Sequence, residues 1–236
     1  MAYQAVFKRY ELKYLLTTAQ KEAMLQVMAP YMELDQYGRT TIRNIYFDTE
    51  NHRLIRRSIE KPMYKEKLRI RSYRKAEAGG KVFVELKKKY DGVVYKRRIS
   101  MPYQRAMEWI CDGTGAPDSQ IGREVEYFRK YYQDLRPAVY LSYEREAYFS
   151  RDGSDFRVTF DDCIYAREDR LSLSDEPGGC RILPEGFVLM EVKTSGAIPL
   201  WMTKHLTSQR IFKTSFSKYG TAYQTMIFSK GAYANV

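Results

Sequence analysis

The chain has 236 residues, of which 44% are hydrophobic, so it is long enough to bury a sizeable core. Its 40 Lys and Arg outnumber its 29 Asp and Glu, and the formal net charge of +11 favours an anionic partner: a nucleotide, a nucleic acid, an anionic membrane or inorganic phosphate. We expect one domain over residues 1–236, because all-β barrels often reach this length.

The cysteines and the apolar segments exclude several other classes. Cys111, Cys163 and Cys180 are odd in number and contain no C-x-x-C pair, so neither a disulfide framework nor a zinc site is indicated. The N-terminal segment does not resemble a signal peptide, and no segment reaches the ~20 apolar residues that span a bilayer. We therefore expect a cytoplasmic protein, which would reach a membrane only through a partner.

The first 50 residues predict two strands and a helix. Residues 6–16 alternate in polarity, which is typical of a strand. Thr17 and Gln20 have the spacing of a capping box that opens an amphipathic helix, and Pro30 marks its expected end. Residues 41–48 are predicted to form the second strand.

A meander of three strands follows. The predicted strands cover residues 66–74, 81–90 and 93–101. Ala78-Gly79-Gly80 and Asp91-Gly92 supply the turns between them. All three strands carry cations on one face, and consecutive hairpin strands cannot all be sheet edges. The charged face of a central strand therefore requires a functional reason.

The second half of the chain mixes helices and strands. Pro102 is predicted to open a helical stretch, and a loop at 112–118 separates it from a second helix that bears Val125 and Tyr131. We expect both helices to cover the outside of the sheet. The remaining predicted elements are strands at 138–149, 156–161 and 186–193, a long loop at 167–185, and a mostly helical segment from Pro199 to Phe228.

Charged residues recur at every second position of the predicted strands. Successive side chains of a strand point to opposite faces, so each such set lies on one face. A single set is typical of a solvated face, whereas five or six suggest a closed sheet whose lumen holds a polyanion. The sets are Arg9, Glu11 and Lys13; Lys67, Arg69 and Arg71; Glu85, Lys87 and Lys89; Lys96 and Arg98; Arg157 and Asp161; Glu191 and Lys193.

Each set also has a simpler structural interpretation. Arg69 and Arg71 can make bidentate contacts to neighbouring phosphates, but basic side chains also protect sheet edges from aggregation. Glu191 and Lys193 interrupt an apolar strand, and a buried ion pair would satisfy them as well as a ligand would. Lys218 lies near a predicted helix start, where backbone N–H groups and a lysine can hold a terminal phosphate.

Taken in order, these motifs resemble those of the VTC domain, the catalytic module of polyphosphate polymerases within the CYTH-like triphosphate tunnel metalloenzymes. The likeness covers about residues 6–224. The motifs that carry it are Glu11-x-Lys13, Leu-Arg69-x-Arg71, Val-Glu85-x-Lys87, Lys96-x-Arg98, Tyr143-x-Arg145, Arg157 with Asp161, Glu191-Val-Lys193 and Phe-Ser-Lys218-Tyr.

The resemblance implies an α+β fold: an antiparallel eight-stranded β tunnel barrel with a charged lumen, flanked by helices. It also implies a set of phosphate-binding residues with catalytic roles, and Lys193 as a further residue that binds the substrate. Glu191 is implied as the ligand of Mn²⁺ or Mg²⁺, with Glu11 and Glu85 as further candidates. The phosphate-binding set is Lys13, Arg69, Arg71, Lys87, Lys96, Arg98, Arg145, Arg157 and Lys218.

One departure from the wider superfamily separates two activities. Tunnel triphosphatases usually begin with E-x-E-x-K, whereas this chain has Arg9-x-Glu11-x-Lys13. Hydrolysis in that group relies on several acidic ligands that hold metals and orient water. A cation in place of the first carboxylate therefore favours an ATP-dependent polyphosphate polymerase, which transfers the γ-phosphate of ATP to a growing polyphosphate chain.

Two other functions stay open. A triphosphatase of the same fold would act on inorganic triphosphate or on a nucleoside triphosphate, and a non-catalytic module would only bind polyphosphate. Nucleic-acid binding, for which 21 tyrosines could supply stacking platforms, is not expected, because the cations follow strand faces instead of clustering with aromatic residues. In relatives this domain is often tied to a membrane channel, so a separate membrane subunit is a candidate partner.

Overall fold

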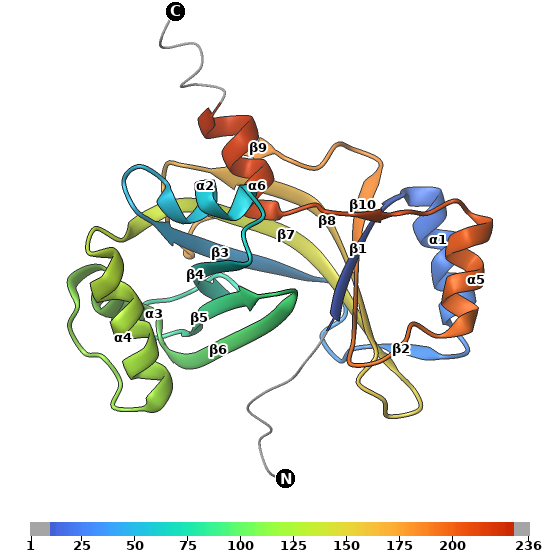
Figure 1. Cartoon of the computed structure of the whole chain (residues 1–236), viewed down its shortest axis with the longest axis horizontal. Helices are drawn as coiled ribbons and strands as arrows, with labels where there is room; N and C mark the ends of the chain where they lie inside the picture. The colour runs from blue at the N-terminus through green and yellow to red at the C-terminus, as the bar shows by residue number, and fades with distance from the viewer. Residues whose placement is uncertain (1–9, 229–236) are drawn as a thin grey trace, which may run out of the picture. The chain divides into compact units, whose positions relative to one another are not determined.

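The computed structural model describes residues 10–228, and the chain divides into two compact units (Figure 1). Unit 1 takes the described residues up to Thr41 together with Tyr143–Ile164 and Leu183–Phe216. Unit 2 takes Ile42–Ser142, Tyr165–Ile182 and the described residues from Ser217 onward. Residues 6–9 of the expected first strand, Arg9 included, lie outside the described range.

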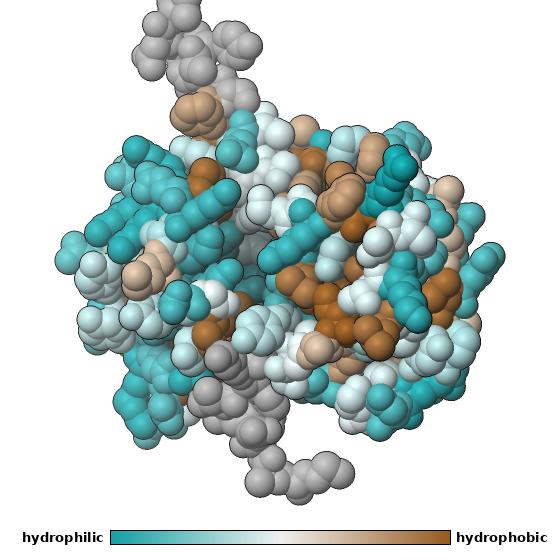
Figure 2. Space-filling view, turned by 45° about the vertical axis from the view of Figure 1, so that its right-hand side comes forward, coloured by the Kyte–Doolittle hydropathy of each residue, from teal (hydrophilic) through white to brown (hydrophobic). Residues whose placement is uncertain are grey.

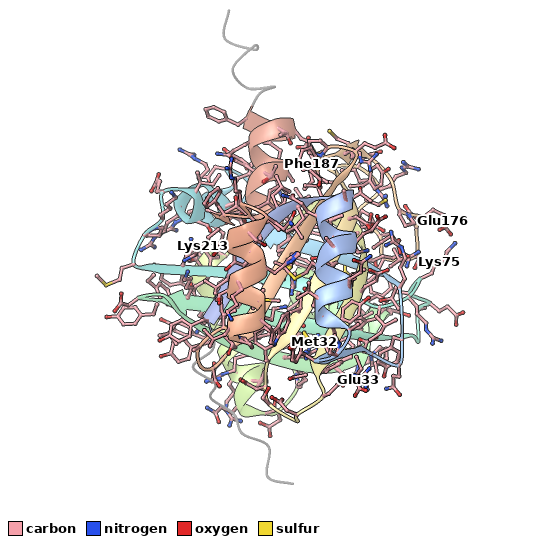
Figure 3. All side chains as sticks on the ribbon, turned by 90° about the vertical axis from the view of Figure 1, so that its right-hand side faces the viewer. Met32, Glu33, Lys75, Glu176, Phe187 and Lys213 are labelled. Carbon is pink, nitrogen blue, oxygen red and sulfur yellow. The ribbon has the colours of Figure 1, made fainter. Side chains whose placement is uncertain are left out.

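Unit 1 is an antiparallel sheet with two helices on its apolar face. In this unit β1 pairs with β10 and β11, β10 pairs with β8, and β2 pairs with the end of β7. Helices α1 and α5 lie side by side in Figure 3. The elements are β1 (Tyr10–Thr17), α1 (Thr18–Met28), β2 (Met32–Leu34), β7 (Arg136–Ser150), β8 (Arg157–Arg167), β10 (Phe187–Thr194), α5 (Leu200–Ser208) and β11 (Lys213–Thr214).

The alternation of β1 separates two environments. Tyr14 and Leu16 point into a core shared with α1 and α5, whereas Glu11 and Lys13 occupy the opposite face. The helix α1 begins with the predicted capping box, since the Thr17 hydroxyl accepts the Gln20 N–H (3.2 Å) and the Gln20 side chain accepts the Thr17 N–H (3.0 Å). This cap fixes the direction in which α1 leaves β1. The helix therefore lies over the apolar face of β1, and the polar face points away from the core.

Unit 2 contains the predicted meander. Strands β3, β4, β5 and β6 pair antiparallel in sequence order, and β9 pairs with β8. The helices α3 and α4 pack against the apolar face of β5 and β6, around the buried ring of Trp109 (Figure 1). The elements are β3 (Thr40–Asp48), α2 (Arg53–Ile59), β4 (Tyr64–Ser72), β5 (Lys81–Tyr90), β6 (Val93–Pro102), α3 (Tyr103–Met107), η1 (Glu108–Asp112), α4 (Gln120–Tyr132), β9 (Cys180–Arg181), α6 (Lys218–Ala222) and η2 (Tyr223–Phe228).

The turn between β5 and β6 follows its sequence signal. Asp91 and Gly92 both have positive φ, 43° and 80°, as a two-residue type I′ hairpin requires. This turn keeps β5 and β6 in register from Tyr90 to Lys81 without a bulge. Residues two apart on these strands therefore stay on one face along the whole hairpin.

The α+β fold class with an antiparallel sheet and flanking helices is confirmed, but the closed barrel is not. The strands form an open path in each unit, β11-β1-β10-β8 in unit 1 and β3-β4-β5-β6 in unit 2, so the predicted eight-stranded closed barrel is wrong. Short elements carry too few residues for a periodic signal, which is why β2, α2, β9 and β11 have no counterpart among the predicted elements. No helix within residues 10–228 has the length and apolar character needed to cross a bilayer.

Candidate functional site

The polar face of the β4–β6 meander in unit 2 carries a large excess of positive charge. The register is continuous, so alternate residues share this face. Among the charged residues at these positions of the described strands, nine are cations and one, Glu85, is a carboxylate. In Figure 2 the left-hand part of the visible surface is predominantly hydrophilic. The cations are Lys65, Lys67, Arg69, Arg71, Lys81, Lys87, Lys89, Lys96 and Arg98.

Glu85 lies at the centre of this face. Its side chain is 1% exposed, and its cross-strand neighbours in the register are Arg69 and Arg98. One carboxylate oxygen accepts from Arg98 Nε and lies near Lys96 Nζ, each at 2.6 Å. The other oxygen accepts from Arg69 Nε at 2.8 Å and lies 2.7 Å from its Nη2, with Arg71 Nη1 at 3.9 Å. A carboxylate has about four lone-pair sites, and the short contacts occupy all of them.

The protonation of this cluster follows from its geometry. Burial by itself would raise the pKa of Glu85, but Arg69, Arg71, Lys96 and Arg98 together hold its pKa well below the ordinary value. Burial and the neighbouring guanidiniums lower the pKa of Lys96, which the attraction of Glu85 only partly offsets. Glu85 is therefore ionised at neutral pH, and Lys96 is the cation of this cluster that loses its proton most readily.

Strand β3 supplies polar groups that orient the two arginines of β4. Asn44 and Tyr46 lie opposite Arg71 and Arg69 in the register. Arg71 Nε donates to Asn44 Oδ1 at 2.8 Å, and the Asn44 amide donates in turn to the Leu141 carbonyl. Arg69 Nη1 donates to the Tyr46 hydroxyl at 2.8 Å. Both guanidiniums are thus fixed from two sides, which is the preorganisation that anion binding requires.

Tyr46 also connects this face to α6. Its ring stacks on Tyr219 at 4.8 Å between centroids, and the Tyr219 hydroxyl donates to the buried Asp48 at 2.9 Å. Burial would raise the pKa of Tyr46, but Arg69, Arg71 and Lys218 lower it overall. Lys218 lies next to Ser217, whose hydroxyl accepts from Lys67 Nζ at 3.1 Å. The predicted phosphate-binding Lys218 is therefore brought to the same region as Arg69.

The polar face of unit 1 is built differently. Cross-strand rows join Glu11, Lys193 and Arg157 in one line and Lys13 with Glu191 in the next. Arg145 of β7 reaches the same face through its contacts with Asp161 and Glu191. Among the residues that the structure describes, four cations here face three carboxylates, so these charges nearly balance. The cations are Lys13, Arg145, Arg157 and Lys193, and the carboxylates are Glu11, Asp161 and Glu191.

Glu191 is surrounded by cations at longer distances than Glu85 is. Its carboxylate lies 3.6 Å from Lys13 Nζ, 3.5 Å from Arg145 Nη2 and 3.3 Å from Lys193 Nζ. Lys13 Nζ also lies 3.5 Å from Glu11 and donates to the Phe216 carbonyl at 2.9 Å. Burial lowers the pKa of Lys193, which Glu191 only partly restores. These contacts are ion pairs of loose geometry.

Asp161 and Arg145 form the tight pair of unit 1. Asp161 is fully buried and accepts from Arg145 Nε and Nη2, each at 2.6 Å. Burial would lower the pKa of Arg145, but Asp161 and then Tyr143 raise it well above the ordinary value. Arg157 packs its guanidinium 4.1 Å from the Phe149 ring centroid. Arg145 and Arg157 are therefore held by the protein before any ligand arrives.

The carboxylates fit a divalent cation unequally. Mg²⁺ and similar ions are commonly held by one or two carboxylates together with the phosphate oxygens of a substrate. Glu191 suits that arrangement, because its contacts to nitrogen atoms are loose and Glu11 lies in the neighbouring row. Glu85 does not, since cations already occupy its oxygens, and we interpret it as a counter-ion. Residues 10–228 contain no group of three or more His, Cys, Asp and Glu side chains suited to a metal ion.

The sequence motifs thus divide between two faces. Unit 1 holds Glu11, Lys13, Arg145, Arg157, Glu191 and Lys193, and unit 2 holds Arg69, Arg71, Glu85, Lys87, Lys96, Arg98 and Lys218. Lys87 stands between Lys67 and Lys96 in one cross-strand row. Sequence reasoning missed Asn44 and Tyr46, although both occupy alternate positions of the predicted strand 41–48. That alternation was the available signal.

Solved structures share this fold at low sequence identity. A candidate adenylate cyclase from Bacillus halodurans matches with a TM-score of 0.56 and 13% identity, over 94% of this chain and 100% of that one. A candidate adenylyl cyclase from Hippeastrum, described as having a dominant triphosphatase activity, matches with a TM-score of 0.52 and 16% identity, over 92% and 95% of the two chains. The fold is thus that of the CYTH-like adenylate cyclases and triphosphatases.

The family follows from the sequence itself. The family model of the VTC domain matches residues 8–227, and the chain therefore belongs to the VTC domain family. The resemblance stated from the ordered motifs is confirmed. No curated protein sequence matches the chain.

Proposed function

We propose that this protein is an ATP-dependent polyphosphate polymerase. The observation that carries the proposal is the polar face of β4–β6, where nine cations accompany one carboxylate in a VTC-family chain. Such an excess of positive charge is unfavourable in an empty protein and becomes favourable when a polyanion binds. A chain of phosphates is the polyanion that fits a row of regularly spaced cations.

The proposed reaction is a direct transfer. A terminal oxygen of the phosphate or polyphosphate acceptor forms a bond to the γ-phosphorus of ATP, the bond from that phosphorus to the β,γ-bridging oxygen breaks, and ADP leaves with the electron pair. Charge accumulates on the transferred group and on the bridging oxygen, where preorganised guanidinium and ammonium groups stabilise it. No nucleophilic side chain is required.

The cations differ in how firmly the protein holds them, and we assign their roles accordingly. Arg69, Arg71 and Arg98 are oriented by Glu85, Tyr46 and Asn44, and they would bind phosphate oxygens without reorganising. Lys13, Arg145, Arg157 and Lys193 complete the set in unit 1, and Lys87, Lys96 and Lys218 complete it in unit 2. Glu191, with Glu11 beside it, would hold Mn²⁺ or Mg²⁺, which when bound neutralises charge on the phosphate oxygens.

A triphosphatase is the second candidate. The Hippeastrum protein of this fold has a dominant triphosphatase activity. The carboxylates of unit 1 argue against hydrolysis here, because Asp161 is fully buried and both of its oxygens pair with Arg145, which disfavours a role in orienting water.

A membrane subunit that takes up the product is a further proposed partner.

The test is to incubate the purified protein with ATP and Mn²⁺, with and without a short polyphosphate primer, and to resolve the products on a gel stained for polyphosphate. We expect a ladder that lengthens with time. Release of phosphate without a ladder would establish a triphosphatase instead. Binding of triphosphate without turnover would identify a non-catalytic module.

Two carboxylate variants test the assignment of the metal ligand. Glu191→Gln removes the proposed metal ligand and should abolish the ladder at every Mn²⁺ concentration. Glu144→Gln is the matched control, because Glu144 lies one residue from Arg145 and accepts from the Thr41 hydroxyl at 2.7 Å, away from the cation cluster. Its ladder should match that of the unmodified protein. Unchanged Mn²⁺-dependent turnover in Glu191→Gln would refute the assignment of the ligand.

A further inference from the structure

A pocket of about 290 Å³ opens in unit 2 at the end of the cation face. Its walls include the rings of Tyr73 and Phe83 and the side chain of Ala76, with Lys75 and Lys81 among its other lining residues. The volume lies just below the range of roughly 300–1,000 Å³ typical of small-molecule sites, so the pocket suits one part of a ligand. None of its aromatic residues belongs to the proposed phosphate-binding set.

The two rings have the geometry of an aromatic recognition site. Tyr73 and Phe83 pack edge to face with centroids 5.6 Å apart. Arg98 lies against both, with its guanidinium carbon 4.3 Å from the Phe83 centroid and 5.6 Å from the Tyr73 centroid. Lys81 Nζ lies 5.7 Å from the Phe83 centroid. A phosphate group would gain little binding energy from the two rings. A planar heterocyclic base, in contrast, can stack on an aromatic ring whichever base it is.

The pocket continues the face that holds Glu85. Phe83 lies opposite Arg71 in the register and two residues before Glu85 on β5, so its side chain points to the same face. Two residues of a strand span about 7 Å. Tyr73 stands in the same relation to Arg71, just beyond the end of β4. A ribose and its α-phosphate can bridge this separation, which places a base beside the rings when the phosphates lie on the arginines.

We propose that the Tyr73–Phe83 pocket binds the base of the nucleoside triphosphate that donates phosphate. This inference rests on the proposed function and deepens it, because it assigns the donor to the nucleotide class. Lys75, which lines the pocket, pairs with Glu176 at 2.8 Å, and the two side chains extend toward one another in Figure 3. The acceptor polyphosphate has no base and would not use this pocket.

The test compares two ligands that share a triphosphate but differ in the base. Affinities for ATP and for inorganic tripolyphosphate are measured by calorimetry with EDTA present, so that no phosphate is transferred. We expect Tyr73→Ala to weaken ATP binding about tenfold more than it weakens tripolyphosphate binding, which is the scale of one lost base–aromatic contact. Phe83→Leu, which keeps the apolar volume but removes the ring, should give a smaller loss of the same kind.

A matched control exists on the neighbouring strand. Tyr95 is 37% exposed, against 38% for Tyr73, and it lies on the face of β6 opposite Lys96 and Arg98. Tyr95→Ala should bind both ligands as the unmodified protein does. Tyr73→Phe, which keeps the ring but loses the hydroxyl that accepts from Arg98, should retain the preference for ATP.

Each remaining outcome overturns the inference in a distinct way. Equal losses for both ligands in Tyr73→Ala would mean that the ring acts on phosphate binding through Arg98. Unchanged affinities for both would mean that the base lies elsewhere, and the proposed polymerase would stand. Failure of the unmodified protein to bind either ligand would remove the proposed function together with the pocket.

Discussion

The polar faces of the two units use buried carboxylates in opposite ways. In unit 2 one carboxylate, Glu85, stands among nine cations and takes contacts of 2.6–2.8 Å from three of them. Among the described residues of unit 1, three carboxylates stand among four cations, and the ion pairs of Glu191 with Lys13, Arg145 and Lys193 are 3.3–3.6 Å long. A lone carboxylate in a cationic field acts as an internal counter-ion, whereas a nearly balanced face leaves Glu191 suited to a metal.

The comparison also separates two kinds of arginine. Arg98 shares Glu85 with other cations and keeps 31% of its side chain exposed. Arg145 is held by a fully buried Asp161 at 2.6 Å through two nitrogens, and its side chain is 14% exposed. Bidentate pairing fixes a guanidinium in one plane. Arg145 therefore stabilises the fold in addition to its proposed contact with the ligand, whereas Arg98 is proposed to act mainly on the ligand.

The largest expected effect comes from neutralising Glu85, the counter-ion of unit 2. Glu85→Gln leaves the cations around this buried position facing one another without a counter-charge, so we expect the free energy of unfolding to fall by about 3–5 kcal/mol. Glu191→Gln removes looser contacts and should cost about 1 kcal/mol. Urea unfolding followed by circular dichroism measures both. Equal losses in the two variants would contradict the distinction between the two carboxylates.

The second prediction concerns alkaline pH. Burial lowers the pKa of Lys96 below that of an ordinary lysine, so Lys96 loses its charge first as the pH rises toward about 10.4. A phosphate contact needs the charged form, and its loss should weaken tripolyphosphate binding about tenfold. The free energy of unfolding changes in the opposite direction. Between the lowered pKa of Lys96 and the pKa of an ordinary lysine, the unfolded chain binds more protons than the folded one, so the contribution of Lys96 to stability rises with pH.

Lys96→Arg is the matched variant for this prediction, because a guanidinium stays charged throughout the window. The quantity to compare is the ratio of the two affinities at each pH between about 7 and 10, in which the ionisation of the ligand itself cancels. The ratio should move in favour of Lys96→Arg as the pH rises. A ratio that does not change with pH would show that Lys96 makes no titrating contact with phosphate.

The smallest expected effect concerns an orienting hydroxyl. Tyr46→Phe removes the acceptor for Arg69 Nη1 and should weaken tripolyphosphate binding about threefold, since one hydrogen bond contributes about 0.5–1.5 kcal/mol. Tyr14→Phe is the control, because Tyr14 is equally buried at 6% but faces the apolar core of unit 1. Calorimetry with tripolyphosphate distinguishes them, and equal affinities for the two variants would exclude an orienting role for Tyr46.

The sequence by itself determined the local structure that places these residues. The alternation of β1, β4, β5 and β6 assigned their charged faces, and the capping box at Thr17 and the turn at Asp91-Gly92 were predicted and are observed. These features depend on side chains a few residues apart, whose geometry is set by the helix or strand itself. The order of the motifs also identified the VTC family.

Only the tertiary structure decided what each charge does. Glu85 and Glu191 have the same i, i+2 relation to a lysine, yet cations contact Glu85 at 2.6–2.8 Å, whereas the ion pairs of Glu191 are 3.3–3.6 Å long. Which cations reach a carboxylate depends on the register between strands far apart in the chain, such as Arg69 opposite Glu85 and Glu85 opposite Arg98. Pairing between strands also placed Tyr46 against Arg69 and brought Tyr73 and Phe83 together to form their pocket. Sequence spacing cannot report these contacts, because they are formed across strands and not along them.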